Sequence, residues 1–130
     1  MILLDTHVVI WLALTPEKIS PVATAAIRKA ESAGAISGIS AITLYEVVYA
    51  IRRGQIQPSV PHQVFLNRIR SRFKAFPVSD TIALCAAELP KPFHGDPIDR
   101  IIAATAIVRD CTLITHDDLI RKANVCKTLW

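Results

Sequence analysis

Five carboxylates stand where the chain is expected to leave a strand or enter a helix. They are Asp5, Glu46, Asp96, Asp99 and Asp117. In an open parallel sheet, ligands bind outside the carboxyl ends of the strands, where the loops enter helices. We therefore expect these acids to gather at one edge of a sheet, although they are far apart in the sequence. Three or four carboxylates within a few ångströms repel one another unless a cation holds them.

Such a cluster predicts a site for a hard divalent cation. Ligand sets made only of oxygen select ions such as Mg²⁺ or Mn²⁺. An ion of this kind polarises a phosphoryl oxygen and lowers the pKa of bound water, so phosphodiester hydrolysis is the expected chemistry. The four histidines lack the paired spacing of a zinc site. His7 and His116 each adjoin one of the acids and could touch a substrate.

Two of the acids, Glu46 and Asp5, differ in how readily a structural role explains them. The segment from Thr43 to Glu46 matches a capping box, in which the glutamate bonds back to the start of its own helix. A solvated position on the polar face of that helix is a further alternative for Glu46. Asp5 directly follows a buried strand, and no nearby Lys or Arg offers it a partner.

The other three acids lie beside helix starts. Asp96 precedes Pro97 and suits a helix N-cap, and Asp99 would favour the dipole of the same helix. Asp117 could cap the helix that follows it. Residue by residue, the sequence leaves capping and metal binding both open.

The elements that must position these acids alternate between strand and helix. Strands are expected at residues 2–4, 36–40, 76–78 and 112–115, and the pattern also allows a final strand at Val125. Helices are expected at residues 8–14, 21–34, 43–54, from Pro61 onward, 79–89 and 97–109, with a helical turn at 118–122. This alternation predicts an α/β fold, a three-layer α/β/α sandwich around a mostly parallel sheet.

Length and composition predict one soluble domain spanning residues 1–130. A chain of 130 residues has room for a single core, and no linker or repeat interrupts it. No apolar run approaches the roughly 20 residues that span a bilayer. The three cysteines form no Cys-x-x-Cys pair, which fits a reducing cytoplasm. The formal charge of +4 permits an anionic partner.

Four segments resemble the motifs of PIN domains, particularly those of VapC-type toxins. They are Leu3-Leu4-Asp5-Thr6-His7, Ser40-Ala41-Ile42-Thr43-Leu44-Tyr45-Glu46, His94-Gly95-Asp96-Pro97-Ile98-Asp99-Arg100-Ile101-Ile102-Ala103-Ala104 and Leu113-Ile114-Thr115-His116-Asp117. One such motif is a weak signal, but four in the family's order cover the chain from Ile2 to about residue 120. The resemblance implies a parallel sheet between helices, an acidic pocket for Mg²⁺ or Mn²⁺, and endoribonuclease activity. It also implies a cognate VapB-like antitoxin and self-association, most simply as a homodimer.

The resemblance assigns roles to particular acids. It implies a catalytic set of Asp5, Glu46, Asp99 and Asp117, in which the three aspartates bind the metal and Glu46 completes the cage. Asp99 matches the aspartate just before the family's Ile-Ala-Ala run, so Asp96 is left as a secondary ligand or only a cap. Secondary roles also fall to Thr6 and Thr115, whose hydroxyls could steady the ligands or bound water.

Basic and aromatic side chains give weaker signals. The arginines that could contact RNA phosphates are Arg52, Arg53, Arg68, Arg70, Arg72 and Arg100, with Lys74 beside them. A solvated helix face is the alternative for this set, and an ion pair with a neighbouring acid is the alternative for Arg100. Trp11, Tyr45 and Tyr49 are expected in the core or at an interface rather than under bases. Tyr45 and Tyr49 lie one helical turn apart and could form part of a dimer or antitoxin surface.

Other functions remain open from the sequence. A non-catalytic RNA-binding or scaffold domain could keep this fold while its acids serve only as helix caps. A phosphatase with an aspartate nucleophile usually carries a second aspartate two residues later, whereas Asp5 is followed by Thr6 and His7. A nuclease acting on structured DNA or in ribosomal RNA processing is a further alternative.

Overall fold

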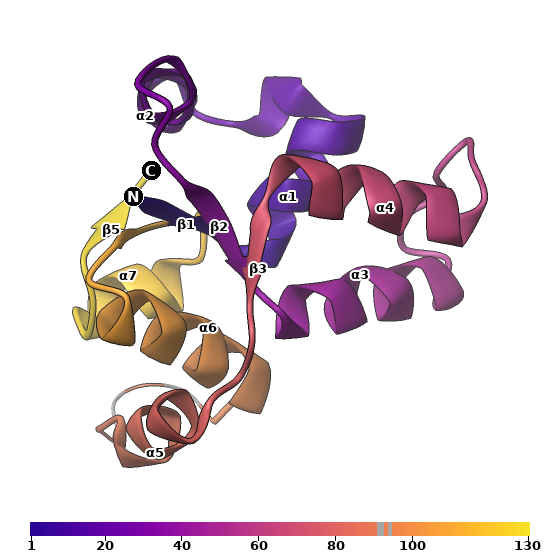
Figure 1. Cartoon of the computed structure of the whole chain (residues 1–130). Helices are drawn as coiled ribbons and strands as arrows, with labels where there is room; N and C mark the ends of the chain where they lie inside the picture. Colours follow the sequence, from indigo (N-terminus) through magenta and orange to yellow (C-terminus); the bar gives the residue numbers. More distant parts are fainter. Residues whose placement is uncertain (91–92, 94) are drawn as a thin grey trace.

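A five-stranded sheet, in which every neighbouring pair of strands is parallel, forms the centre of the molecule (Figure 1). The computed structural model describes residues 1–90, 93 and 95–130. The strands are β1 (Ile2–Leu4), β2 (Ser37–Ser40), β3 (Lys74–Phe76), β4 (Thr112–Ile114) and β5 (Thr128–Leu129). Their order in the sheet is β3-β2-β1-β4-β5, so the chain crosses from one side of β1 to the other. This order creates a switch point at the carboxyl end of β1, where ligands bind in such sheets.

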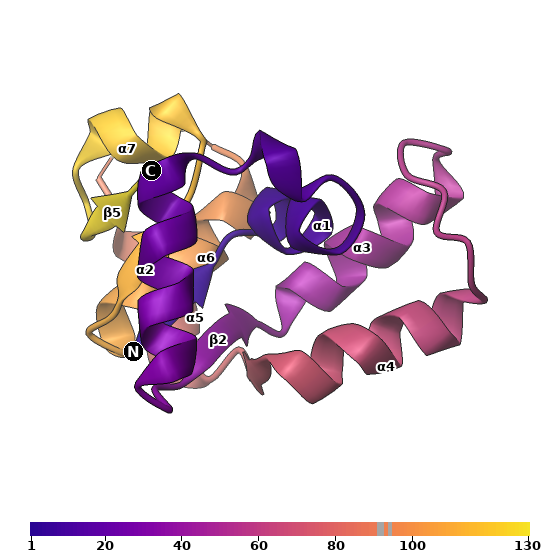
Figure 2. The same ribbon diagram turned by 90° about the horizontal axis from the view of Figure 1, so that it is seen from above.

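Helices cover both faces of the sheet (Figures 1 and 2). They are α1 (Thr6–Leu14), α2 (Pro21–Ser32), α3 (Ile42–Arg52), α4 (His62–Arg72), α5 (Asp80–Glu88), α6 (Pro97–Val108) and α7 (Asp118–Ala123), with a 3₁₀ turn at Pro16–Lys18. Leu4 of β1 packs with α1 to α4, whereas its neighbour Leu3 packs with α6 and α7. The predicted α/β sandwich is confirmed, and its sheet is entirely parallel among the described strands. No described helix is both long enough and apolar enough to cross a membrane.

Local signals in the sequence explain most helix ends. The Ser20 hydroxyl accepts a 3.1 Å hydrogen bond from the backbone N–H of Ala23, and Pro21 occupies the first position of α2. Gly34 follows that helix with a φ of 62°, a conformation that costs glycine little. Helix α1 begins at Thr6 rather than Val8, because the Asp5 carboxylate already caps it.

Two predicted strands were placed wrongly. The expected strand at residues 76–78 lies at Lys74–Phe76, because Pro77 has no N–H to continue a hydrogen-bonded ladder. The final strand lies at Thr128–Leu129 rather than at Val125. Asn124 ends α7 in the left-handed conformation, and the turn that follows occupies the next residues before the chain pairs with β4.

Candidate active site

Asp5 lies at the carboxyl end of β1 with its side chain almost fully buried, at 3% exposure. Oδ1 accepts a 2.7 Å hydrogen bond from the backbone N–H of Thr6. Oδ2 accepts a 2.7 Å hydrogen bond from the Thr115 hydroxyl, just beyond β4. Burial nevertheless raises the pKa of Asp5 above its usual range. The partners of this carboxylate are thus a backbone amide and a hydroxyl, which fix its direction without neutralising it.

Glu46 reaches the same region from the first turns of α3. Its carboxylate accepts a hydrogen bond from the Thr6 hydroxyl, which also lies 3.3 Å from the hydroxyl of Thr43. The capping-box alternative is not the one realised, because Ala41 is the N-cap of α3 and no side chain caps that helix. Burial, followed by the charges of Asp5 and Asp96, raises the pKa of Glu46. Thr6 therefore connects Glu46 to the end of β1.

Asp99 shows that the acids form one cluster. Burial, followed by the charges of Asp5, Asp96, Asp117 and Glu46 in that order, raises its pKa to about 7. Each of these charges must lie near Asp99 to act on it. The structure therefore brings together all five carboxylates that the sequence singled out, from four separate parts of the chain.

Asp96 and Asp117 cap helices in addition to belonging to this cluster. Oδ1 of Asp96 accepts a 2.9 Å hydrogen bond from the backbone N–H of Ile98 at the start of α6. Oδ1 of Asp117 accepts hydrogen bonds of 2.7 and 3.0 Å from two N–H groups at the start of α7. The Thr115 hydroxyl accepts the N–H of Asp117 at 3.0 Å, so one threonine positions two of the acids. Capping and membership of the acidic site are both observed for these residues.

The donor chemistry of the cluster fits a hard divalent cation. All five side chains offer carboxylate oxygens, the ligands that Mg²⁺ and Mn²⁺ prefer. Within residues 1–90, 93 and 95–130, no three His, Cys, Asp or Glu side chains already stand in an arrangement that could hold a metal ion. The charges of neighbouring acids raise the pKa of Glu46 and of Asp99.

A cavity of about 670 Å³ opens beside the acids. Thr6, Glu46 and Asp96 contribute to its wall, and the other lining residues come mainly from α1, α3 and the segments that follow these helices. Its volume is within the 300–1,000 Å³ typical of ligand pockets. The acidic site therefore adjoins a space large enough for part of a substrate.

The family model of the PIN domain matches residues 2–125. The chain is a PIN-domain protein. It is 32% identical over 120 residues to Ribonuclease VapC22 of Mycobacterium tuberculosis, a match that covers 92% of this chain and 89% of the relative. At that identity and coverage it belongs to the VapC family.

Two solved structures share the fold of this PIN domain. VapBC2 of Rickettsia felis, bound to a DNA fragment from its promoter, matches with a TM-score of 0.76 at 19% identity, covering 99% of this chain and 98% of that one. A toxin–antitoxin complex of Klebsiella pneumoniae matches with a TM-score of 0.64 at 23% identity, covering 100% and 97%. The arrangement of strands and helices is therefore that of PIN-domain proteins along nearly the full length.

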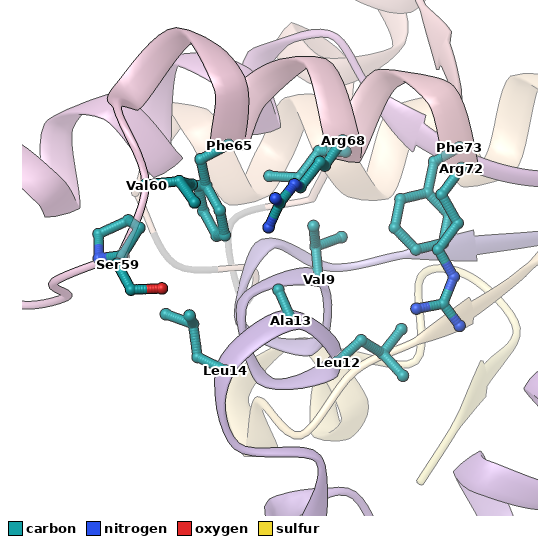
Figure 3. Close-up of a pocket in the computed structure, with 12 residues that line it drawn as sticks. Val9, Leu12, Ala13, Leu14, Ser59, Val60, Phe65, Arg68, Arg72 and Phe73 are labelled. Atoms are coloured by element: carbon teal, nitrogen blue, oxygen red, sulfur yellow. The ribbon is translucent and has the colours of Figure 1, made fainter.

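The basic cluster on α4 of the PIN domain is divided between two environments. Arg68 and Arg72 line an apolar groove of about 240 Å³ between α4 and α1, and Figure 3 shows both side chains reaching toward α1. Arg72 also pairs with Glu31 at 2.8 Å, across exposed surface. Arg70 and Lys74 are exposed. All four side chains are therefore exposed, but two of them also line the groove.

Arg100 and Arg53, two other residues predicted to contact RNA, already form hydrogen bonds with other residues of the chain. The Arg100 guanidinium donates to the backbone carbonyls of Ala86, Phe93, Ala87 and Leu89, at 2.7 to 3.4 Å. These bonds join α6 to the end of α5 and the loop beyond it. The Arg53 guanidinium donates to the Tyr49 hydroxyl at 3.1 Å on exposed surface, and Arg52 is exposed beside it.

Sequence reasoning missed some of the residues around the site. Thr43 was noticed only as one end of a capping box, although its hydroxyl meets that of Thr6. Trp130 contacts Trp11 and His116, and no local pattern signals this contact because its partners are distant in the sequence. His94, part of the third motif, lies outside the described residues.

Proposed function

We propose that this PIN-domain protein is an endoribonuclease that depends on Mg²⁺ or Mn²⁺ and is the toxin of a VapBC-type toxin–antitoxin pair. The observation that carries the proposal is the convergence of the acids on the end of β1, where Thr115 bonds to both Asp5 and Asp117 and Thr6 bonds to Glu46. Burial and the charges of the other four acids raise the pKa of Asp99 there to about 7. Carboxylates that repel one another in this way are stabilised by a cation between them. The relative named Ribonuclease VapC22 supports RNA as the substrate.

Asp5, Asp99 and Asp117 are the residues that would hold the ion, with Glu46 completing the set. A bound Mg²⁺ or Mn²⁺ would polarise a phosphoryl oxygen and lower the pKa of water at the site. The chain's own contribution is to orient these carboxylates before substrate arrives. The Thr115 hydroxyl fixes Asp5, and the Thr6 hydroxyl fixes Glu46.

Exposed arginines are proposed to hold the RNA backbone. Arg52, Arg53 and Arg70 are exposed, and Arg68 is an exposed residue that lines the groove between α1 and α4. Phosphate contacts release counterions, so each one lost should reduce the salt dependence of binding by about one unit of slope. Arg70→Gln and Arg52→Gln are expected to weaken RNA binding at low salt. Arg100→Gln is instead expected to destabilise the fold.

A VapB-like antitoxin is the proposed protein partner. The solved structures that share the fold include a toxin–antitoxin complex, and the groove between α1 and α4 in Figure 3 has an apolar floor at Val9 and Phe65 and an exposed apolar edge at Ala13 and Leu14. Ala13 is exposed in that groove. Ala13→Arg is expected to weaken a complex with the antitoxin by about tenfold or more, as for a charge buried at an interface centre. RNA cleavage by the free protein should persist.

A homodimer is also proposed, with the exposed tyrosines of α3 at its interface. The rings of Tyr45 and Tyr49 stack with centroids 5.8 Å apart and are 55% and 47% exposed. Paired exposed aromatic side chains are enriched at protein interfaces. Sedimentation of the wild type and of Tyr45→Ser tests this: a dimer that becomes a monomer supports it, and a wild-type monomer overturns it.

The activity is tested by incubating purified protein with a mixed RNA pool in EDTA, Mg²⁺ or Mn²⁺. We expect cleavage with either metal, none in EDTA and none with Asp5→Asn. Asp118→Asn is the matched control, because Asp118 is an exposed acid outside the cluster. Folded protein that cuts nothing with either metal would contradict the proposal. Equal cleavage by the Asp5→Asn variant would contradict the assigned site.

A further inference from the structure

The cavity beside the acids is lined by acidic, aromatic and basic side chains in different places. At one end of it lie Thr6 at the start of α1, Glu46 of α3 and Asp96, the N-cap of α6. Farther along α1 and α3 the wall carries the rings of Trp11 and Tyr49. Lys18, which follows the end of α1, adds a cation. An acidic end, an aromatic middle and a basic side chain thus line one continuous space.

Trp11, which lines this cavity, contacts three other aromatic rings. Its ring meets His7 at a centroid distance of 6.0 Å, His116 at 5.5 Å and Trp130 at 5.7 Å. The Lys18 ammonium lies 6.0 Å from the same ring centroid. His7 and His116 are exposed and sit two residues after Asp5 and one before Asp117, respectively. The ring therefore contacts two histidines that are neighbours of Asp5 and Asp117 in the sequence.

This combination of groups fits one unpaired nucleotide. A base offers a flat aromatic face to an indole or phenol ring, and a phosphate on either side offers negative charge. A purely apolar ligand would form no favourable contact with the acids at one end of the cavity or with Lys18. A duplex keeps its bases stacked internally and presents mainly backbone. The cavity volume of about 670 Å³ leaves room for a base together with its sugar.

We propose that this cavity binds an unpaired nucleobase of single-stranded RNA against Trp11, with Lys18 contacting the adjoining phosphate. The inference rests on the proposed ribonuclease function, which places the scissile phosphate at the acids. Trp11 and Trp130 also pack against the core that α1 to α4 share. The test must therefore separate base binding from a merely structural role of the ring.

The test measures binding of two labelled twelve-nucleotide probes in EDTA, where cleavage is absent. One is oligoadenylate, and the other is an abasic ribose-phosphate chain of the same length and charge. Stacking is worth roughly 1–3 kcal/mol per base, so the wild type should bind oligoadenylate about tenfold more tightly than the abasic chain. Trp11→Leu should bring this ratio close to one without changing affinity for the abasic chain, and Trp11→Phe should keep part of it.

Lys18→Gln should weaken binding of both probes equally, whereas Lys29→Gln, an exposed lysine on α2, should weaken neither. A wild-type ratio near one would overturn the inference, as would a folded Trp11→Leu variant with an unchanged ratio. If Trp11→Leu fails to fold, the wild-type ratio and Trp11→Phe still decide. If the wild type cleaves RNA with metal but binds both probes equally, only this subsite is rejected. If the folded protein cleaves no RNA, the proposed function is rejected.

Discussion

The hydroxyl of Thr115 donates a 2.7 Å hydrogen bond to Oδ2 of Asp5 across 110 positions of the sequence. These two residues follow the neighbouring parallel strands β4 and β1. The same hydroxyl accepts the N–H of Asp117. One side chain beyond the end of β4 thus aligns two of the acids that the proposed metal site requires.

Removing this hydroxyl should make Asp5 harder to ionise. The bond from Thr115 lowers the pKa of Asp5, so its loss in Thr115→Val should raise that pKa further. The acid limb of the pH–rate profile should then move to higher pH, and activity at pH 6 should fall by about tenfold, since hydrogen bonds to charged groups are worth ~1.5–3 kcal/mol. Thr115→Ser should retain the wild-type profile. A profile of Thr115→Val that overlays the wild type would count against this role.

Asp99 should make the metal-free protein less stable as pH rises. The unfolded chain releases the Asp99 proton near its ordinary pKa of 3.8, whereas the folded protein holds it up to about 7. Between these values the folded state binds more protons, so the free energy of unfolding falls with increasing pH and the full penalty is present above pH 7. Urea unfolding in EDTA at pH 5 and pH 8 measures this loss. Asp99→Asn should reduce it, and Mg²⁺ should oppose it in the wild type; equal pH dependence in both proteins would refute the assignment.

Asp96 can be tested for its two roles separately. Asp96→Ala removes the cap of α6 and should cost about 1 kcal/mol of stability, whereas Asp96→Asn keeps the cap and removes only the charge. We expect Asp96→Asn to retain activity within about tenfold, compared with a loss on the order of a hundredfold for Asp99→Asn. An equally severe loss in Asp96→Asn would make this residue a ligand.

Asp117 and its neighbour Asp118 form a matched pair on the same helix. Asn caps helices about as well as Asp, so Asp117→Asn should preserve α7 while removing one charge from the cluster. Activity should fall on the order of a hundredfold. Asp118 is 68% exposed and pairs with Arg121 at 3.2 Å, a surface contact worth about 0–1 kcal/mol. If both variants lose activity alike, charge near α7 rather than the cluster is responsible.

Gly38 should not tolerate a side chain. A Cβ there would lie 2.4 Å from Cε2 of Phe76 on the adjacent strand. Gly38→Ala should therefore destabilise the protein by about 1–3 kcal/mol, as for other overpacked positions. The same substitution at Gly95 meets no atom within 4 Å and serves as the control. Chemical denaturation of the two variants, and of Gly38→Ala combined with Phe76→Leu, measures whether the clash with Phe76 is the cause.

The sequence predicted those features of the fold and site that depend on a local pattern of residues. The alternation of strands and helices predicted the sandwich, and Asp96 before Pro97 predicted both a helix start and one acid of the cluster. The contact between Thr6 and Glu46 could not be predicted, because the same Thr43-to-Glu46 spacing describes a capping box. The donor of the hydrogen bond to this glutamate depends on how α1 and α3 approach each other, which the whole fold determines.

The same limit applies at the end of the chain. The short final strand was misplaced because its pairing with β4, rather than its own composition, decides where it lies. Trp11 was expected in the core or at an interface, and it does pack on the core, but it also lines the cavity. Periodicity identifies apolar faces well and says little about which half-buried ring remains open to a ligand.

The strand order has a consequence for how this protein is made. Asp5 leaves the ribosome before the other acids, but β1 is central and stays unpaired on one side until β4 has been synthesised. Thr115 and Asp117 arrive only then. A growing chain therefore carries the first acid without its partners, so the proposed catalytic centre assembles only after the segment through Asp117 has been synthesised. For a proposed toxin made on the host's own ribosomes, the topology itself delays the onset of activity until β4 and the acid after it have been synthesised.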